Sequence, residues 1–598
     1  MKTLEKTALG IIIVLIVVII VITIYTFFCW LADRKLKLIN RECADIIIIG
    51  AGTAGSVLGR RLHERHPRLK ILIMERGQDR HADPKVYNIA KALEIAYTEP
   101  YSETIPTKVS SSLAELEVKA EVSIARLTGG GSSHSFALAV YGSPDFYNAE
   151  WQEQLGLSYD DLNKSCGIFD RIENQIEINM LPVKFNILEM IGPALKKAYC
   201  KYDPLEATRI LERTATVAAN VGPLRAPDTI SDVILKAIKR TKPNVKIVED
   251  YNSKITACAS KNPQLFVDGI LGIRNSADVA YIPHSYLLNE CHTNLHVGED
   301  MTTDKLLMRG KSCYGVQWTD SCKNSHITAL NRGGRVILAA GAIHSPLILQ
   351  KSGIGSLTAL GEKIGSNLMN HYGCSLIFET VCDFNFSSGP LAFVPNDDHP
   401  NENRRDWQMV VGGEVLLNPL LLAKVDRDPK CGNYITFLNW ILHPRTRGSI
   451  QVDYDGMPVI ELKIYEDGDL KDKKSDIYTI VQSLRWMYRL VIEMRKSELL
   501  RGDGIKLVFP PEEVMLRDDS RELERWAKIG LSQTDHYCGT NSLGTVVNPD
   551  DFKVYNTDNI HVVDASVFPS ISDSNTTFPV LVMSEIASDR ISKLVDRK

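Results

Sequence analysis

The fold of this chain is decided by Asp45-Ile-Ile-Ile-Ile-Gly50-Ala-Gly52-Thr-Ala-Gly55 and by Lys70-Ile-Leu-Ile-Met-Glu75-Arg-Gly77, which follows it. Residues 46–49 are apolar and β-branched, which is typical of a buried parallel strand, and they lead directly into a G-x-G-x-x-G pattern. Residues 56–65 carry apolar side chains at helical spacing, and a second apolar run ends at Glu75. The pattern predicts a strand, a glycine turn, a helix and a second strand that ends in an acid.

This unit predicts a dinucleotide-binding site. Gly50 permits the tight turn, Gly52 lets the backbone approach a pyrophosphate, and Gly55 lets the helix pack closely on the strand. The helix N-terminus then faces the phosphates with its positive end. Glu75 is placed to accept hydrogen bonds from ribose hydroxyls and to repel the extra phosphate of NADP. The alternative is an ordinary βαβ unit without a ligand. The predicted contacts here are Gly50, Gly52, Thr53, Ala54, Gly55 and Glu75.

Length and composition set the broad class of the protein. The chain has 598 residues, which exceeds the size at which one hydrophobic core keeps growing, so we expect two domains. Its composition is ordinary for a globular protein. A net charge of -4 offers no broad basic surface, and this argues against nucleic acid as a partner.

The N-terminus departs from the rest of the chain. Residues 8–32 form an almost unbroken apolar run, long enough for one transmembrane helix and longer than the core of a cleaved signal peptide. We therefore expect a retained single-span membrane anchor, followed by a linker at residues 33–43. More basic residues follow the run than precede it, which favours a cytoplasmic domain only slightly, so the side of the membrane stays open.

The cysteine and histidine patterns do not predict a metal site. Twelve cysteines are scattered along the chain without a C-x-x-C pair. The group Cys291, His292 and His296 lacks a convincing carboxylate partner, and residues 294–297 alternate like a strand.

Three later segments repeat the signature of a nucleotide-binding fold. The glycine- and serine-rich run at residues 126–135 would bring backbone N–H groups close to a phosphate or a flat ring, with a flexible loop as the alternative. Residues 334–346 and 561–566 each read as a buried strand that leads into a turn. We expect the first of these strands to form a second edge of the same sheet.

Together these segments resemble the glucose-methanol-choline (GMC) oxidoreductase family, FAD enzymes that oxidise alcohols. The resemblance runs in family order over nearly the whole chain after residue 44. Its pieces are the fingerprint with Glu75-Arg-Gly77, Gly129-Gly130 to Gly142-Ser143-Pro144, Gly341-Ala-Ile-His-Ser-Pro346, Ser352-Gly-Ile-Gly355, Gly365-Ser-Asn367-Leu-Met-Asn-His371, Arg445-Thr-Arg-Gly448, His536-Tyr-Cys-Gly539-Thr540 and Val563-Asp-Ala-Ser566 to Asn575-Thr-Thr-Phe-Pro579.

The resemblance implies how the site is built. His536 falls on the family's catalytic histidine and Asn575 on its second catalytic position, so His536 would accept the hydroxyl proton while the Asn575 amide donates to the developing alkoxide. Isoalloxazine would lie against residues 131–135. The further cofactor contacts that it implies are Gly130, Gly131, Ser132, His134, Ser135, Val297, Asp564 and Ala565.

The chain departs from the family pattern in the flavin loop. Ser135 stands where most members have Asn, and Tyr141 replaces the usual Arg. His134 matches the position at which some members join a histidine covalently to a flavin ring methyl. We hypothesise covalent FAD at His134, with noncovalent packing on the ring as the alternative.

We therefore predict an α/β fold with a discontinuous Rossmann-like FAD-binding domain at residues 44–150, 240–368 and 534–598. An α+β substrate domain with an antiparallel sheet takes residues 151–239 and 369–533. Residues 449–454 and 459–464 alternate as strands of that sheet would, and residues 477–494 have the spacing of one long amphipathic helix. The expected function is oxidation of a small-molecule alcohol, with oxygen or another electron acceptor. A redox-silent descendant with a binding role and a flavin-containing hydroxynitrile lyase are the alternatives.

Overall fold

The computed structural model describes residues 43–81, 83–180, 228–268, 273–287, 292–356, 359–380, 389–398, 404–413, 433–500 and 504–596. Within these ranges no helix is both long and apolar enough to cross a bilayer. The predicted anchor at residues 8–32 and linker at 33–43 fall almost wholly outside them.

The first sheet has the predicted βαβ unit at its centre. Strand β1 (Cys43–Ile49), helix α2 (Thr53–Arg65) and strand β2 (Ile71–Met74) follow in order. β1 lies parallel between β2 and β12 (Ser325–Leu338), while β9 (Leu295–Gly298) and β22 (Ile560–Val562) extend the parallel arrangement on either side. The strand that we expected at an edge, within β12, therefore lies directly beside β1. Strands β10 (Thr302–Arg309) and β11 (Ser312–Thr319) add an antiparallel edge.

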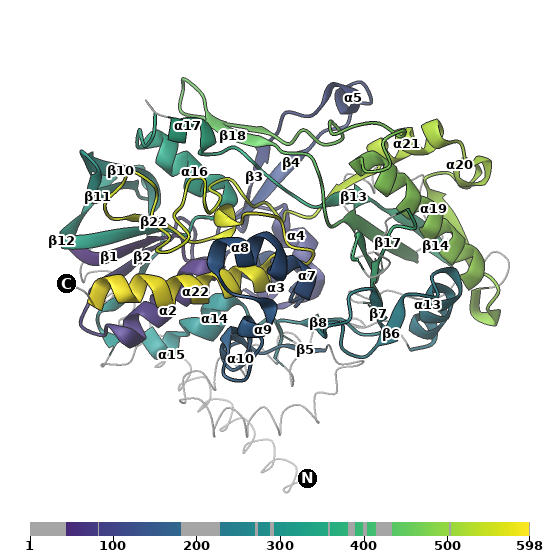
Figure 1. Ribbon diagram of the computed structural model, residues 1–598, viewed down its shortest axis with the longest axis horizontal. Helices are drawn as coiled ribbons and strands as arrows, with labels where there is room; N and C mark the ends of the chain where they lie inside the picture. The colour runs from purple at the N-terminus through teal and green to yellow at the C-terminus, as the bar shows by residue number, and fades with distance from the viewer. Residues whose placement is uncertain are drawn as a thin grey trace, which may run out of the picture.

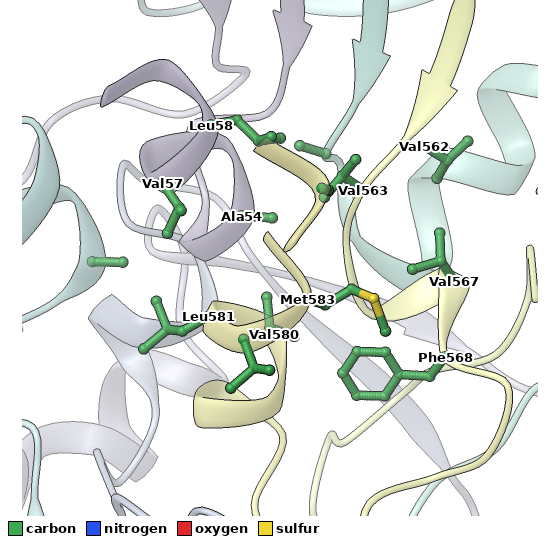
Figure 2. Packing of buried hydrophobic residues seen from close by; sticks show 14 of the residues in the cluster. Ala54, Val57, Leu58, Val562, Val563, Val567, Phe568, Val580, Leu581 and Met583 are labelled. Carbon is green, nitrogen blue, oxygen red and sulfur yellow. The ribbon is translucent and has the colours of Figure 1, made fainter. Parts of the chain in front are cut away.

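Helices cover both faces of this sheet. α2 packs against the C-terminal helix α22 (Thr577–Asp596) on one side, and α16 (Gly341–Lys351) lies on the other (Figure 1). Figure 2 shows Val57 and Leu58 of α2 close to Leu581 of α22 and Val563 after β22. All four side chains are buried. The packing brings the C-terminal segment onto the N-terminal fingerprint.

The second sheet has nine strands and is mostly antiparallel. Helix α19 (Asp476–Met494), predicted from its apolar periodicity, packs against it together with α13 (Asp228–Thr241) (Figure 1). Its strands are β6 (Lys246–Val248), β7 (Cys258–Ser260), β13 (Tyr372–Cys374), β14 (Leu376–Thr380), β15 (Leu391–Val394), β16 (Trp407–Gly412), β17 (Tyr434–Ile441), β20 (Ile505–Phe509) and β21 (Leu531–Gln533).

The observed sheet membership differs from the expectation in two places. β6 and β7 belong to the second sheet, although the sequence placed them in the FAD-binding segment. β18 (Ser449–Val452) and β19 (Pro458–Glu461) alternate as expected, but they form a separate hairpin that packs on α16. Alternation shows that a strand has one buried face; it does not show which layer covers that face.

Candidate active site

We call the part of the fold built on the first sheet the first lobe and the part built on the nine-stranded sheet the second lobe. The two glycine turns of the first lobe meet backbone to backbone. Gly50 has a φ of 106°, and a Cβ atom there would lie 2.5 Å from the carbonyl oxygen of Ala339. Gly130 has a φ of 54°, and a Cβ atom there would lie 2.8 Å from the Cα atom of Gly52. Gly55 is equally closed, because its Cβ would lie 1.9 Å from the Gly50 carbonyl oxygen. Side chains are thus excluded along this part of the cleft.

Glu75 closes the second strand of the unit. Its two carboxylate oxygens accept hydrogen bonds from the backbone N–H groups of Ala51, at 2.9 Å, and Gly77, at 2.8 Å. Burial raises the pKa of Glu75, while the two backbone bonds favour the charged form. Each oxygen keeps a lone pair that a ligand hydroxyl can use.

A cavity of about 620 Å³ is lined by both lobes. Three predicted site residues do not line it, namely Gly55, Ser132 and Val297. Gly55 and Val297 pack within the first lobe. The Ser132 hydroxyl donates to the Gly129 carbonyl and accepts from the Ala277 N–H. The predicted site residues that do line it are Gly50, Gly52, Thr53, Ala54, Glu75, Gly130, Gly131, His134, Ser135, His536, Asp564, Ala565 and Asn575.

His134 ends the short helix α6 (Gly131–His134) at the cavity wall. Both of its ring nitrogens are buried, and neither makes a hydrogen bond of good geometry to a described residue, although the nearby Gly131 backbone acts to raise the pKa of the ring. Burial, followed by the positive charge of Arg274, lowers the pKa of His134 to about 4. The ring is therefore neutral at physiological pH.

The structure shows what Tyr141 and Ser135, the two departures from the family pattern, contact. The ring of Tyr141 stacks on Phe578 of α22 with centroids 3.8 Å apart, and its hydroxyl faces Glu173, so this residue packs between them without lining the cavity. The Ser135 Oγ atom accepts a hydrogen bond of 3.2 Å from the Ala137 N–H.

Asp564 ties the end of β22 to the start of α16. One carboxylate oxygen accepts from the Gly341 N–H, at 2.9 Å, and from the Ser345 hydroxyl, and the other accepts from the Ser566 N–H. Burial raises the pKa of Asp564 against these bonds. Ala565 follows on the cavity wall.

His536 reaches the cavity from the second sheet. It follows β21, whose Gln533 pairs with Tyr372 of β13, and this pairing brings His536 beside His371. The Nδ1 atoms of the two histidines are 2.9 Å apart. The other nitrogen of His536, Nε2, lies 3.3 Å from the Nδ2 atom of Asn575, which precedes α22.

The hydrogen-bond pattern assigns the proton on His536. The Oδ1 atom of Asn575 accepts from Gln408 of β16, at 3.1 Å, so its Nδ2 group donates toward His536. Nε2 of His536 is then the acceptor and Nδ1 carries the proton, which it donates to His371. Burial lowers the pKa of His536 to about 3, so the ring is neutral, and the residue lines the cavity.

Asp535 is a second ionisable group at this end of the cavity. Its φ of 55° lies in the left-handed region, which is uncommon for a residue with a side chain. Its carboxylate oxygens accept from the hydroxyls of Tyr537, at 3.0 Å, and Tyr97, at 3.4 Å. Burial raises the pKa of Asp535 to about 6.

Sequence reasoning gave no role to His371, Gln408 or Asp535. His371 ends the motif Gly365 to His371 that the resemblance includes, and the presence of an imidazole there was the one sequence feature that could have pointed to a role in the site. Gln408 comes from a strand far from His536 in the sequence, and only the sheet brings the two together. Within the described ranges no group of His, Cys, Asp or Glu is arranged to hold a metal ion.

The cavity has the features of an FAD site. Its volume is within the usual range for ligand pockets, its glycine cradle suits a pyrophosphate, and Glu75 offers acceptors to a ribose. His134 and His536 line the same space.

Comparison with known proteins agrees with this arrangement. Two family models, both described as GMC oxidoreductase, match residues 44–373 and 444–584. Pyranose dehydrogenase 3 of Leucoagaricus meleagris is 24% identical over 92% of this chain and 93% of its own length. Choline oxidase of Arthrobacter globiformis is 23% identical over 94% of this chain and 96% of its own. The crystal structure of pyridoxine 4-oxidase from Mesorbium loti superimposes with a TM-score of 0.67 at 21% identity, covering 91% and 98% of the two chains.

Proposed function

This chain belongs to the GMC oxidoreductase family and is an FAD-dependent oxidoreductase, and we propose that it oxidises the CH–OH group of an alcohol with His536 as the base. The observation that carries the proposal is the placement of the His536 Nε2 and Asn575 Nδ2 atoms, 3.3 Å apart, on one cavity with the glycine cradle. An alcohol oxygen in front of the pair, within hydrogen-bond distance of both atoms, can give its proton to the imidazole and accept from the amide.

The chain's own groups divide the work of the reaction. His536 takes the hydroxyl proton, Asn575 stabilises the negative charge on the oxygen, and His371 holds the proton-bearing Nδ1 so that Nε2 stays unprotonated. FAD, when bound, supplies the acceptor for the hydride that leaves the carbon. The substrate carbon thus loses one hydride, its oxygen loses one proton, and a carbonyl compound forms.

The proposed placement of FAD follows the cavity walls. Gly50, Gly52 and Gly130 would receive the pyrophosphate, and Glu75 would bond the ribose. The isoalloxazine would lie against the α6 turn, facing His536. Asp564 and Ala565 would stand near the pyrophosphate and ribityl chain.

We also propose that His134 holds FAD covalently. Its place on the cavity wall and its neutral ring support this. Attachment would replace one methyl C–H bond and one imidazole N–H bond by a C–N bond, and would release two protons and two electrons. The electrons would pass to the acceptor that also serves turnover. Acid-precipitated protein should stay yellow, and colour found only in the supernatant would exclude the bond.

Anaerobic mixing with a panel of alcohols tests the function. An alcohol that bleaches the flavin and appears as a carbonyl compound supports oxidation, and H536A should slow bleaching by orders of magnitude. Aldehyde release without bleaching would indicate a lyase instead. Intact flavin in every mixture would point to a redox-silent descendant.

The apolar run at residues 8–32 remains a proposed membrane anchor. Full-length protein should stay with membranes after extraction at alkaline pH, whereas a chain without residues 8–32 should be released.

A further inference from the structure

Arg274 is a buried arginine directly behind the α6 turn. Its side chain is 2% exposed, and it donates to three backbone carbonyls: Val86, at 2.8 Å, Ser132, at 3.2 Å, and Ser135. The last two belong to the residues that flank His134 in the turn. One guanidinium therefore fixes both ends of the segment that carries His134.

No carboxylate pairs with Arg274 among the described residues, and its Nη2 atom has no hydrogen-bond partner there. Burial lowers the pKa of Arg274 to about 9, which leaves the group mostly charged at neutral pH. Burying an uncompensated charge is unfavourable, because carbonyl dipoles replace only part of the lost hydration. Packing alone therefore does not explain why a charged guanidinium is buried at Arg274.

The positions of Arg274 and His134 relative to the cavity are the second observation. His134 lines the cavity and Arg274 does not, so the turn lies between the guanidinium and the cavity. The positive charge of Arg274 also acts on His134, where it lowers the pKa of the ring. A cation behind this turn would favour electron uptake by a ring that lies in front of it, because reduction adds negative charge.

We propose that Arg274 is a positioning residue that orients the His134 turn against the isoalloxazine and places behind it a positive charge that makes the flavin easier to reduce. The proposal rests on the FAD orientation given under the proposed function. It assigns two separable tasks to one side chain. The fork of N–H donors sets the turn, and the charge sets the reduction potential.

Two substitutions separate these tasks, and a second buried arginine provides the control. R274M removes charge and fork, whereas R274K keeps the charge and loses the fork. Arg405 is also buried, at 1% exposure, and donates to the carbonyls of Thr256, Tyr251 and Ile255, but it does not line the cavity. R405M therefore measures what the loss of a buried arginine does in general.

The readouts are the midpoint potential of the bound flavin, by dye equilibration, and the fraction of flavin that stays with acid-precipitated protein. R274M should have a more negative potential and a several-fold smaller linked fraction than the wild type. R274K should nearly keep the potential and lose linked flavin, and flavin-loaded R405M should match the wild type in both.

Wild-type values of both readouts in R274M would overturn the proposal. If R274M yields no flavoprotein, R274K decides alone, and wild-type values of both readouts in it would overturn the proposal. If wild-type flavin is not linked at all, the potential of R274M decides. Neither readout uses an alcohol, so failure of the proposed oxidation would be recognised separately, by unbleached flavin in the wild type.

Discussion

Replacing His371 by alanine tests the proton assignment at His536. In the wild type, the Nδ1–H group of His536 donates to His371 over 2.9 Å, and the acceptor is fully buried. H371A leaves that donor without a partner in a buried place. The imidazole can then shift its proton to Nε2, the nitrogen that must accept the proton of the alcohol.

The structure sets the size of the effect. A buried donor that loses its acceptor costs about 1–3 kcal/mol, and each 1.4 kcal/mol changes a rate about tenfold. We therefore expect H371A to slow flavin reduction roughly 5- to 150-fold. H371N is the matched variant, because its amide oxygen can take the position of Nδ1, and we expect it to recover most of the rate.

The assay is anaerobic stopped-flow reduction at saturating alcohol, with rates taken per bound flavin. Flavin content and far-UV circular dichroism report whether H371A is folded. A folded, flavin-loaded H371A with the wild-type reduction rate would refute the assignment. Equal losses in H371A and H371N would also refute it, since the acceptor would then be irrelevant.

Three other predictions concern the cofactor cleft, the pH profile and acid stability. G130A should lose FAD, because its Cβ would meet the Gly52 backbone at 2.8 Å, whereas G310A should retain it, since Gly310 has a similar φ, does not line the cavity and would place its Cβ in open space; equal flavin contents after purification would count against the cradle. Asp535, with a pKa of about 6, should give kcat/KM an acid limb near pH 6 that D535N flattens, and an unchanged limb would assign it elsewhere. Burial lowers the pKa of His561 to about 4, so the unfolded chain takes up its proton first as pH falls below about 6.5. Stability present above pH 6.5 is therefore lost between about pH 6.5 and 4, by at most about 3 kcal/mol for this residue, and H561Q should lose less in urea titrations across that window.

The parts of the fold that were predicted correctly depend on local sequence. The βαβ unit follows from apolar runs and glycines within some thirty residues, and α19 follows from its own periodicity. The position of β12 beside β1 and the separate β18–β19 hairpin depend on which distant strand offers a partner. Apolar pattern alone does not encode that choice.

In the site, too, local sequence motifs were predicted and contacts between distant segments were not. His536 and Asn575 were selected through motif positions, and the structure brings them together from β21 and the start of α22. The hydrogen bonds to His371 and Gln408 connect residues more than 160 positions apart. Arg274 was missed because a lone arginine in a loop has no pattern, and only burial without a counterion distinguishes it.

A crystal structure of the flavin-loaded protein with an unreactive alcohol analogue would test the central claim most directly. The account predicts the isoalloxazine against the α6 turn and the analogue's oxygen about 3 Å from both the Nε2 atom of His536 and the Nδ2 atom of Asn575. A flavin bound with His536 turned away from its face, or an analogue held by other groups, would contradict it.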